Sequence, residues 1–180
     1  MAVDALLPMI RSADLSGSDA AVVSAAVGAY LRQTEEEKRR EGLSPRPDGD
    51  GALPERYRAE VDDPAAAYAG FHVLLAEVDD ETLGVVVVAP LDEAAEIKRL
   101  WTAPAARGRG IGSALLDAAV ATAGGAVRLS VWDWRVGAMR LYASRGFAQV
   151  PSWDGRDRLV CMIRQDSSRL QLIRRRRSSR

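Results

Sequence analysis

The spacing of apolar residues predicts three substantial helices in this chain. The first, residues 19–41, starts with apolar side chains on one face: Val22, Val23, Ala26, Val27 and Tyr30. Three residues offer N-caps for it: Ser16, Ser18 and Asp19. Its charged second half, TEEEKRRE, predicts a solvated surface with two ion pairs at helical spacing: Glu35–Arg39 and Glu36–Arg40.

The second helix follows a glycine-rich loop and keeps the same period: Ile111, Ala114, Leu115, Ala118, Ala119 and Thr122. Gly124 and Gly125 end it. The third helix runs through Ala138, Leu141 and Tyr142 and ends at Gly146. A short helix begins at Pro54, since proline is tolerated in a first turn.

Strands are predicted where apolar residues alternate or cluster between turn residues. They fall at residues 6–12, 71–78, 83–89, 96–103, 127–131, 147–150 and 159–163. Pro8 confines the first strand to a sheet edge, and the turn DDET joins the next two into a hairpin. Within residues 96–103, Ile97 and Leu100 are an odd number of positions apart. A β-bulge near Lys98–Arg99 is therefore expected, because it would place both side chains on one face.

This order of elements predicts one α/β domain over residues 1–165 and a basic, disordered tail over residues 166–180. The segment SPRPDGDG, residues 44–51, breaks all periodicity and predicts a mobile loop. The 180-residue chain is 47% hydrophobic and 28% charged, which is typical of a soluble globular protein. Its first residues, MAVDALLPMIRS, do not resemble a secretory signal, and no apolar run is long enough to span a bilayer. We therefore expect a cytoplasmic protein without membrane contact.

The distribution of charge and the scarcity of Cys and His argue against several further kinds of partner and site. Basic and acidic residues are equal in number, 25 each, but residues 164–180 hold seven Arg and one Asp. The remainder of the chain is acidic by the same margin, which argues against a specific nucleic-acid partner. A single Cys161 and a single His72 allow no internal disulfide, cysteine cluster or histidine-rich site, so no metal is expected.

The loop RGRGIG, residues 107–112, stands between a strand and a helix N-terminus, where unpaired amides can bind an anion. It lacks the Gly-Lys-Ser/Thr ending of a nucleoside-triphosphate loop, and Leu115 stands where a dinucleotide fingerprint needs its third glycine. Taken alone, the six residues are equally compatible with a glycine-rich turn that holds no ligand.

Two longer segments favour a ligand-binding loop over a glycine-rich turn without a ligand. EIKRLWTAPAARGRGIGSALLDAAV resembles the acyl-CoA-binding segment of the GNAT N-acetyltransferase superfamily, with Arg107, Gly110 and Gly112 at its defining positions. LSVWDWRVGAMRLYASRGF resembles the family's next strand–helix segment, which closes in the pattern Leu141, Tyr142, Gly146 and Phe147. The resemblance covers residues 70–165 well and the earlier residues only in element order. It implies a GNAT fold, with a central mixed, mostly antiparallel, twisted sheet of six or seven strands flanked by about four helices. A bulged strand splayed from its neighbour would admit acyl-CoA.

The resemblance also implies acetyl-CoA as cosubstrate and the positions that hold it. The loop's backbone amides would bind the pyrophosphate, with two arginines adding charge: Gly108, Gly110, Ile111, Gly112 and Ser113, with Arg107 and Arg109. Main-chain groups of Leu100, Trp101 and Thr102 would hold the pantetheine arm and polarise the thioester. Many family members carry Asn where this chain has Arg135, whose guanidinium would have to reach the phosphate or the arm instead.

Acetyl transfer to an amine needs a base for the amine and an acid for the departing thiolate. Tyr142 occupies the family position whose hydroxyl lies near the sulfur, so it is the candidate acid; the alternative is a core tyrosine. Glu96 and Asp133 are alternative bases, and a water relay could replace both. Cys161 is expected to be a small buried residue away from the thioester, which favours direct transfer in a ternary complex.

Trp132, Asp133 and Trp134 form the candidate acceptor cluster, because aromatic rings beside a carboxylate suit a cationic amine. Alternatively, the tryptophans pack between sheet and helix. The leading hypothesis is an N-acetyltransferase that uses acetyl-CoA and a small-molecule amine acceptor. A protein or peptide N-terminal acetyltransferase and a non-catalytic acyl-CoA sensor are the alternatives. The sequence leaves open whether the protein is a monomer or a homodimer.

Overall fold

The computed structural model describes residues 7–44 and 53–166. The loop predicted at 44–51 and the tail predicted at 166–180 lie outside the described residues, apart from Ser44 and Asp166. Among the described helices, none combines the length and the apolar character needed to cross a bilayer.

Seven strands form one open sheet in the order β1-β2-β3-β4-β5-β7-β6. Their bounds are β1 Met9–Ser12, β2 His72–Val78, β3 Glu81–Pro90, β4 Ala95–Thr102, β5 Val127–Trp132, β6 Ala148–Val150 and β7 Leu159–Arg164. Neighbouring strands are antiparallel except β4 and β5, which are parallel. The mixed, mostly antiparallel sheet and the edge position of the first strand are as predicted.

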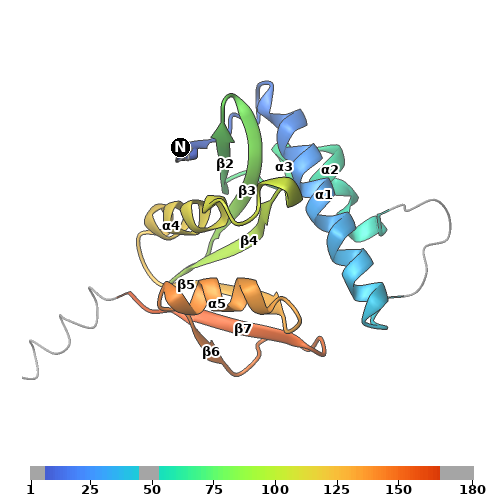
Figure 1. Ribbon diagram of the computed structural model, residues 1–180, viewed down its shortest axis with the longest axis vertical. Helices are drawn as coiled ribbons and strands as arrows, with labels where there is room; N and C mark the ends of the chain where they lie inside the picture. The colour runs from blue at the N-terminus through green and yellow to red at the C-terminus, as the bar shows by residue number, and fades with distance from the viewer. Residues whose placement is uncertain (1–6, 45–52, 167–180) are drawn as a thin grey trace, which may run out of the picture.

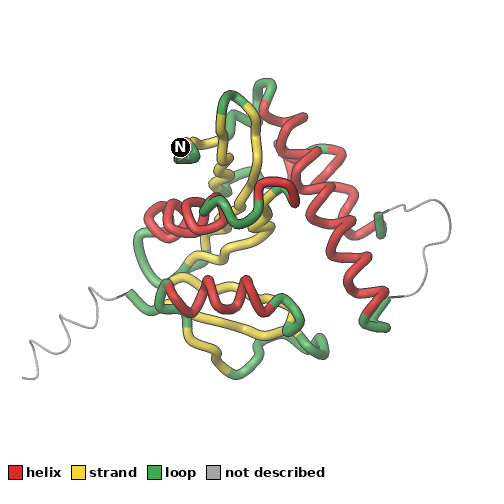
Figure 2. The backbone as a smooth tube through the Cα atoms, viewed as in Figure 1, coloured by secondary structure: helices red, strands yellow, loops and turns green. Residues whose placement is uncertain are grey.

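The helices cover both faces of this sheet (Figure 1). They are α1 Asp19–Arg40, η1 Glu55–Tyr57, α2 Arg58–Asp62, α3 Pro64–Ala67, η2 Pro104–Ala106, α4 Ile111–Ala123 and α5 Val136–Ser144. The short helix predicted from Pro54 is thus a 3₁₀ turn, η1, that continues into α2. In Figure 2, α1 runs down the right of the view, while α4 and α5 lie over the strands at the left and lower centre.

Two hydrophobic clusters follow from the alternation of side chains along β3. Val86 and Val88 pack in one cluster with α4 and α5, while Val85 and Val87 pack in the other with α1. Gly84 lets α4 approach this strand closely, because a Cβ there would lie 2.8 Å from Leu115 Cδ1. Both faces of the sheet are therefore buried at its centre, which fixes the positions of α1 and α4 relative to β4.

The bulge predicted in β4 is present. Val85 pairs with Trp101 and Val87 with Lys98, so β4 holds one extra residue opposite β3. Arg99 takes a left-handed backbone conformation there, with φ +53°. Ile97 and Leu100 consequently contact the same hydrophobic cluster.

Beyond the bulge, β4 and β5 separate. They pair only between Ala95–Ile97 and Val127–Leu129, after which β4 continues along β3 and β5 along β7. The sheet therefore opens at its centre.

The charged second half of α1 is solvated on one face only, so the prediction of a solvated surface was wrong for the other face. Thr34, Glu35 and Lys38 are only 4%, 3% and 9% exposed. Glu35 pairs with Lys38 at 2.7 Å and Arg56 at 3.0 Å rather than with Arg39. The cause lies in the tertiary structure, because Ser44 and Arg56 of η1 donate hydrogen bonds to Glu35 and cover this part of the helix. The predicted pair of Glu36 with Arg40 is present at 3.1 Å.

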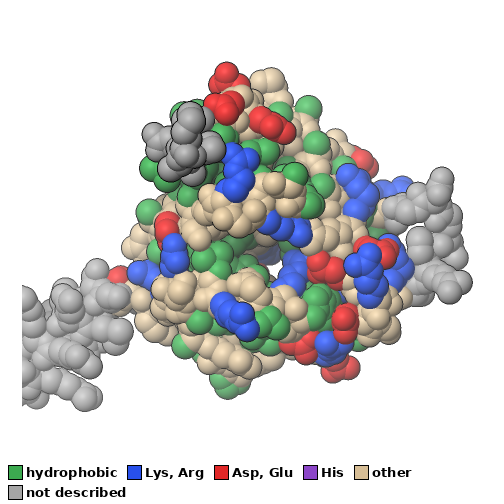
Figure 3. Space-filling model, viewed as in Figure 1, with side chains coloured by type: hydrophobic (Ala, Val, Ile, Leu, Met, Phe, Trp, Pro, Cys, Tyr) green, Lys and Arg blue, Asp and Glu red, His purple; other side chains and the backbone are tan. Residues whose placement is uncertain are grey.

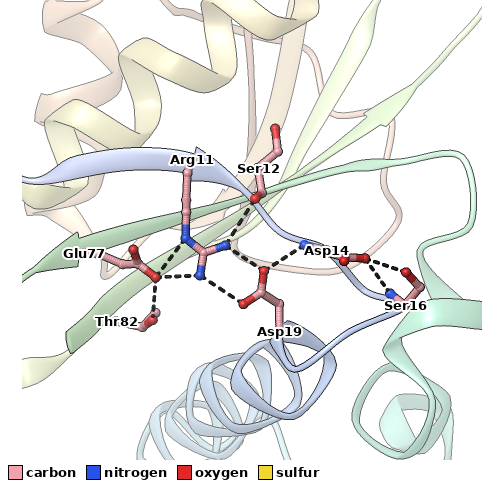
Figure 4. Close-up of polar contacts among 7 residues, drawn as sticks. All are labelled: Arg11, Ser12, Asp14, Ser16, Asp19, Glu77 and Thr82. Atoms are coloured by element: carbon pink, nitrogen blue, oxygen red, sulfur yellow. Dashed lines mark hydrogen bonds and ion pairs between the residues drawn. The ribbon is translucent and has the colours of Figure 1, made fainter. Parts of the chain in front are cut away.

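Arg11 ties β1 to α1 and β2 (Figure 4). Its guanidinium donates to both carboxylate oxygens of Asp19, at 2.6 and 2.9 Å, and to Glu77 at 2.6 Å. Asp19 also accepts from the Asp14 amide at 2.8 Å, and these contacts lower its pKa to about 2, the Arg11 hydrogen bond most strongly. Ser18, the residue before α1, makes no side-chain capping bond, so Asp19 is the predicted cap residue that anchors the helix start.

Candidate functional site

A cavity of about 610 Å³ opens where β4 and β5 separate, bounded by the glycine loop and α5; we call it the loop cavity. Its lining includes eleven of the residues predicted from the sequence: Leu100, Trp101, Thr102, Arg107, Gly108, Gly110, Ile111, Gly112, Ser113, Arg135 and Tyr142. Figure 3 shows the surface hollowed near the centre of this face, with Lys and Arg side chains beside the hollow. The structure thus brings together residues from three predicted segments.

The glycine loop presents backbone amides that have no partner of their own. Gly108 and Gly110 take φ +77° and +81°, conformations that favour glycine. Gly110 is the residue before α4, and no side chain caps the helix there. Within residues 7–44 and 53–166, no amide from Gly108 to Ser113 donates a hydrogen bond. Such a row at a helix N-terminus can bind a phosphate or pyrophosphate anion.

The main chain of β4 offers further free groups beside this loop. Trp101 is paired with Val85, and the Ala103 amide donates to the Leu83 carbonyl at 2.8 Å. Because hydrogen-bonded and non-hydrogen-bonded pairs alternate in an antiparallel ladder, the main-chain groups of Leu100 and Thr102 point away from β3. The Thr102 carbonyl accepts a hydrogen bond from Arg107 Nε at 3.3 Å. An extended ligand arm could therefore pair with the main chain of Leu100 and with the Thr102 amide, whereas the Thr102 carbonyl is already engaged by Arg107.

A second, smaller cavity of about 190 Å³ lies on the other side of the strand opening; we call it the strand cavity. Glu96 and Trp132, two of the predicted residues, line it. It shares four lining residues with the loop cavity: Tyr30, Leu100, Arg135 and Tyr142. The two cavities therefore meet at two tyrosines and an arginine.

Tyr142 is buried at this junction, 7% exposed. Its ring lies 6.0 Å from the ring of Phe147, and among the described residues its hydroxyl makes no hydrogen bond. Burial raises the pKa of Tyr142 well above its usual value, Tyr30 adds to the rise, and Arg135 opposes it. The hydroxyl is consequently protonated at neutral pH and can donate a hydrogen bond into the cavity.

The end of α1 contributes residues to the site that the sequence did not single out. Gln33 Oε1 accepts from Arg107 Nη2 at 2.6 Å and from Trp101 Nε1 at 3.3 Å. Its amide donates to Glu37 at 2.7 Å. Gln33 therefore links the glycine loop and β4 to α1.

Glu37 continues this link to the turn between β5 and α5. Its Oε2 accepts from Trp134 Nε1 at 3.0 Å and from Arg135 Nε at 2.7 Å, while Arg135 also donates to Thr34 at 2.8 Å. Burial alone would raise the pKa of Glu37, but the hydrogen bonds from Gln33, Trp134 and Arg135 outweigh it, so the pKa is lowered. Arg135 is thus held by α1 at the junction of the cavities, with its guanidinium 5.2 Å from the Tyr30 ring centre.

A sequence signal for these residues exists. Tyr30, Gln33, Thr34 and Glu37 follow Val23 and Val27 at helical spacing, so they continue the buried stripe of α1. When the residues on the buried face of a helix change from apolar to polar toward one end, that end is expected to contact a polar site.

Several predicted residues lie outside the loop cavity. Arg109 is exposed. Asp133 lines neither cavity, because Arg158 lies over its carboxylate at 2.9 Å, and Trp134 stacks on Trp132 with ring centres 4.9 Å apart. Cys161 is buried in β7 and lines neither cavity.

Glu96 faces the strand cavity but is already paired. One of its carboxylate oxygens accepts two hydrogen bonds from Arg128, at 2.8 and 3.1 Å. If Glu96 is the base, it must therefore accept the amine proton while it is paired with the Arg128 guanidinium.

The open sheet has separated central strands, a helix N-terminus of unpaired amides and a cavity running from it, an arrangement that can hold an anionic ligand with an extended arm. Residues 31–147 match the model of the acetyltransferase (GNAT) family, and the chain belongs to this family.

Solved structures share this fold at low sequence identity. An acetyltransferase of the GNAT family from Staphylococcus aureus Mu50 is 16% identical, with a TM-score of 0.63 over 88% of this chain and 98% of that one. PaiA N-acetyltransferase from Thermoplasma acidophilum, solved in complex with coenzyme A, is 19% identical, with a TM-score of 0.61 over 88% of this chain and 98% of that one.

A third structure, "histone acetyltransferase HPA2 and related acetyltransferase" from Corynebacterium glutamicum, is 22% identical, with a TM-score of 0.65 over 90% and 98% of the two chains. No curated protein sequence matches the chain. The fold and the family predicted from the sequence are confirmed, and membership of this family indicates acyl transfer from acyl-CoA.

Proposed function

We propose that the protein is an N-acetyltransferase that moves an acetyl group from acetyl-CoA to the amine of a small molecule by direct attack in a ternary complex. One observation carries the proposal. A row of free amides, Gly108 to Ser113, leads into a cavity that ends at Tyr142, where a second cavity begins. A donor and an acceptor can thus reach the same point from opposite sides of the opened sheet.

The residues of the loop cavity fit acetyl-CoA. The free amides would hold its pyrophosphate, with the exposed Arg109 beside it. The main-chain groups of Leu100 and Thr102 would hold the pantetheine arm as an added strand. Arg107 is committed to Gln33 and the Thr102 carbonyl, so its role would be to brace the loop rather than to bind phosphate.

In the reaction, the acceptor nitrogen attacks the thioester carbonyl carbon, so that a C–N bond forms and the C–S bond breaks. The departing thiolate gains one proton and the new ammonium loses one. A donor amide from β4 would stabilise the oxyanion. The Tyr142 hydroxyl would donate to the thiolate, because it is protonated, buried and at the junction of the cavities.

The base is the less defined group. Glu96 lines the strand cavity and could receive the amine proton directly or through water. Asp133 is held by Arg158 outside both cavities, which disfavours it. The buried position of Cys161 away from the junction supports direct transfer without an acyl-cysteine intermediate.

The test is to mix the protein with acetyl-CoA and a panel of primary amines and to follow release of free thiol. Calorimetric titration with acetyl-CoA alone measures donor binding separately. We expect saturable acetyl-CoA binding and amine-dependent thiol release. Binding without release on a broad panel would instead support an acyl-CoA sensor, and absence of binding would contradict the donor assignment.

A further inference from the structure

The strand cavity has a marked excess of cationic side chains. Four basic residues line it, Lys98, Arg99, Arg135 and Arg156, against the single carboxylate of Glu96. The carboxylates paired with three of these cations lie outside the lining: Glu60, Glu37 and Asp154. The charged ends nearest the cavity are therefore mainly positive, with the negative partners behind them.

Arg99 is held rigidly in this arrangement. The left-handed backbone at the bulge aims its side chain away from the regular strand direction. Its guanidinium donates two hydrogen bonds to Glu60, at 2.7 and 2.5 Å. It also lies 5.7 Å from the ring centre of Tyr30 and 5.6 Å from that of Tyr57. A non-glycine residue at positive φ is costly, and these contacts compensate for it.

Lys98 is the cation with the weakest protein partner. Its Nζ lies 3.9 Å from Glu96, beyond hydrogen-bond distance, and it donates no hydrogen bond to the rest of the described chain. Glu96 is itself neutralised by Arg128 at 2.8 Å. An incoming anion would therefore meet a positive charge that is only weakly paired, on a side chain that is 41% exposed.

The cavity is also small and aromatic. Its volume of about 190 Å³ has room for about six water molecules at ~30 Å³ each. Aromatic rings form part of the wall: Tyr30, Tyr57, Trp132 and Tyr142. This space suits a compact molecule, or one end of a larger one.

We infer that the acceptor is a small primary amine that also carries an anionic group, a carboxylate or a phosphate, held on the Lys98 side of the strand cavity. The inference rests on the proposed acetyltransferase function and names the class of its acceptor. Neighbouring positive charge would hold the anion and favour the neutral form of the amine, whose lone pair attacks the thioester. A dicationic acceptor would be repelled for the same reason, in contrast to the cationic amine predicted from Trp132, Asp133 and Trp134.

Matched acceptor pairs test the inference: β-alanine against its amide, phenylalanine against its amide, and 2-aminoethyl phosphate against ethanolamine. Putrescine serves as the dicationic comparison. We expect kcat/KM to be about tenfold or more higher for the anionic member of at least one pair. The carboxylate and phosphate pairs then separate the two kinds of anion. Equal or higher kcat/KM for the neutral members or putrescine overturns the inference and leaves the acetyltransferase proposal standing.

Variants at Lys98 test the inference more directly than the acceptor pairs alone. The quantity measured is kcat/KM for the anionic member of a pair divided by kcat/KM for its neutral member. Lys98→Gln should reduce this ratio about tenfold, and Lys98→Arg should retain most of it. Arg140→Gln removes a positive charge from an exposed position of α5 outside both cavities and should leave the ratio unchanged. A ratio that is the same in Lys98→Gln as in the wild type contradicts the inference.

Failure of the proposed function gives a different pattern. In that case acetyl-CoA either does not bind, whichever amine is present, or binds without thiol release on the broad panel of amines. If acetyl-CoA binds but no pair is turned over, calorimetric dissociation constants decide. Tighter binding of the anionic members to the acetyl-CoA complex supports the inference, and equal affinity within each pair overturns it.

Discussion

Two tyrosines from distant parts of the chain meet where the cavities join. Tyr30 comes from α1 and Tyr142 from α5, and both line both cavities. Tyr142 is buried against the core apart from the part that faces the cavities, and burial raises its pKa. The ring of Tyr30 instead has two guanidinium groups near it, that of Arg99 at 5.7 Å and that of Arg135 at 5.2 Å from the ring centre. The two hydroxyls thus lie close to the same junction but in different electrostatic surroundings. Replacing each tyrosine by phenylalanine in turn therefore shows which hydroxyl acts in the reaction.

Tyr142→Phe should lower kcat about 10²-fold, because the departing thiolate loses its proposed donor. The dissociation constant of acetyl-CoA should change less than about twofold, since the ring and its packing remain. Steady-state kinetics and calorimetry measure the two effects, and thermal unfolding checks the fold. Tyr30→Phe is the comparison; if it alone abolishes turnover, the acid is Tyr30 and the role proposed for Tyr142 is wrong.

At the scale of elements, the site depends on how α4 begins. Gly110 precedes the helix at φ +81°, and the amides from Gly110 to Ser113 donate no hydrogen bond within the described residues. A Cβ at Gly110 would meet no atom within 4 Å, so the cost of a side chain there comes from backbone conformation rather than from collision.

Gly110→Ala should therefore cost about 1–2 kcal/mol of stability and weaken acetyl-CoA binding about tenfold, because the loop relaxes and its amides turn. Urea denaturation and calorimetry measure these effects. Gly125→Ala is a suitable control, since Gly125 follows the other end of α4 with open space and no positive φ. An acetyl-CoA affinity unchanged in Gly110→Ala would count against the loop as the pyrophosphate site.

Over the whole molecule, α1 is attached at both ends. Its start is held to the edge of the sheet by Arg11 and Asp19, and its end is held to the site through Gln33 and Glu37. Loosening the first attachment should lower global stability, because the helix covers one face of the sheet.

Asp19→Asn should reduce the free energy of unfolding by about 1–3 kcal/mol at neutral pH, because Arg11 loses a charged partner. The folded-state pKa of Asp19, about 2, lies below its ordinary value of 3.8. Its contribution is therefore fully present above about pH 4 and is lost as the pH falls through 2. The difference between wild type and variant should shrink across that window.

Urea denaturation at several pH values measures this difference. Asp117→Asn provides the control, because that carboxylate is 54% exposed in its pair with Arg145 and should contribute less than about 1 kcal/mol. A difference for Asp19→Asn that stays constant from pH 7 to 2 would show that the Arg11 contact does not carry the effect.

Features that follow from local rules could be predicted from the sequence alone. Helical and strand periods, the displaced register of Ile97 and Leu100, and the glycine loop each depend on residues a few positions apart. They predicted the seven strands, the three long helices, the bulge and the segments from which the family was recognised, and the structure and comparisons confirm these, whereas the short helices α3 and η2 were not predicted.

Which side chains meet across the site depends instead on how distant segments pack. Glu37 contacts Arg135 across 98 positions, and Arg107 contacts Gln33 across 74. A charged run at helical spacing has the same pattern whether water or another segment covers it, so the sequence predicted a solvated surface where α1 forms a wall of the site. The position of Asp133 outside the cavities and the cationic lining of the strand cavity have the same origin. They result from the way β4 and β5 separate and from what packs across that opening.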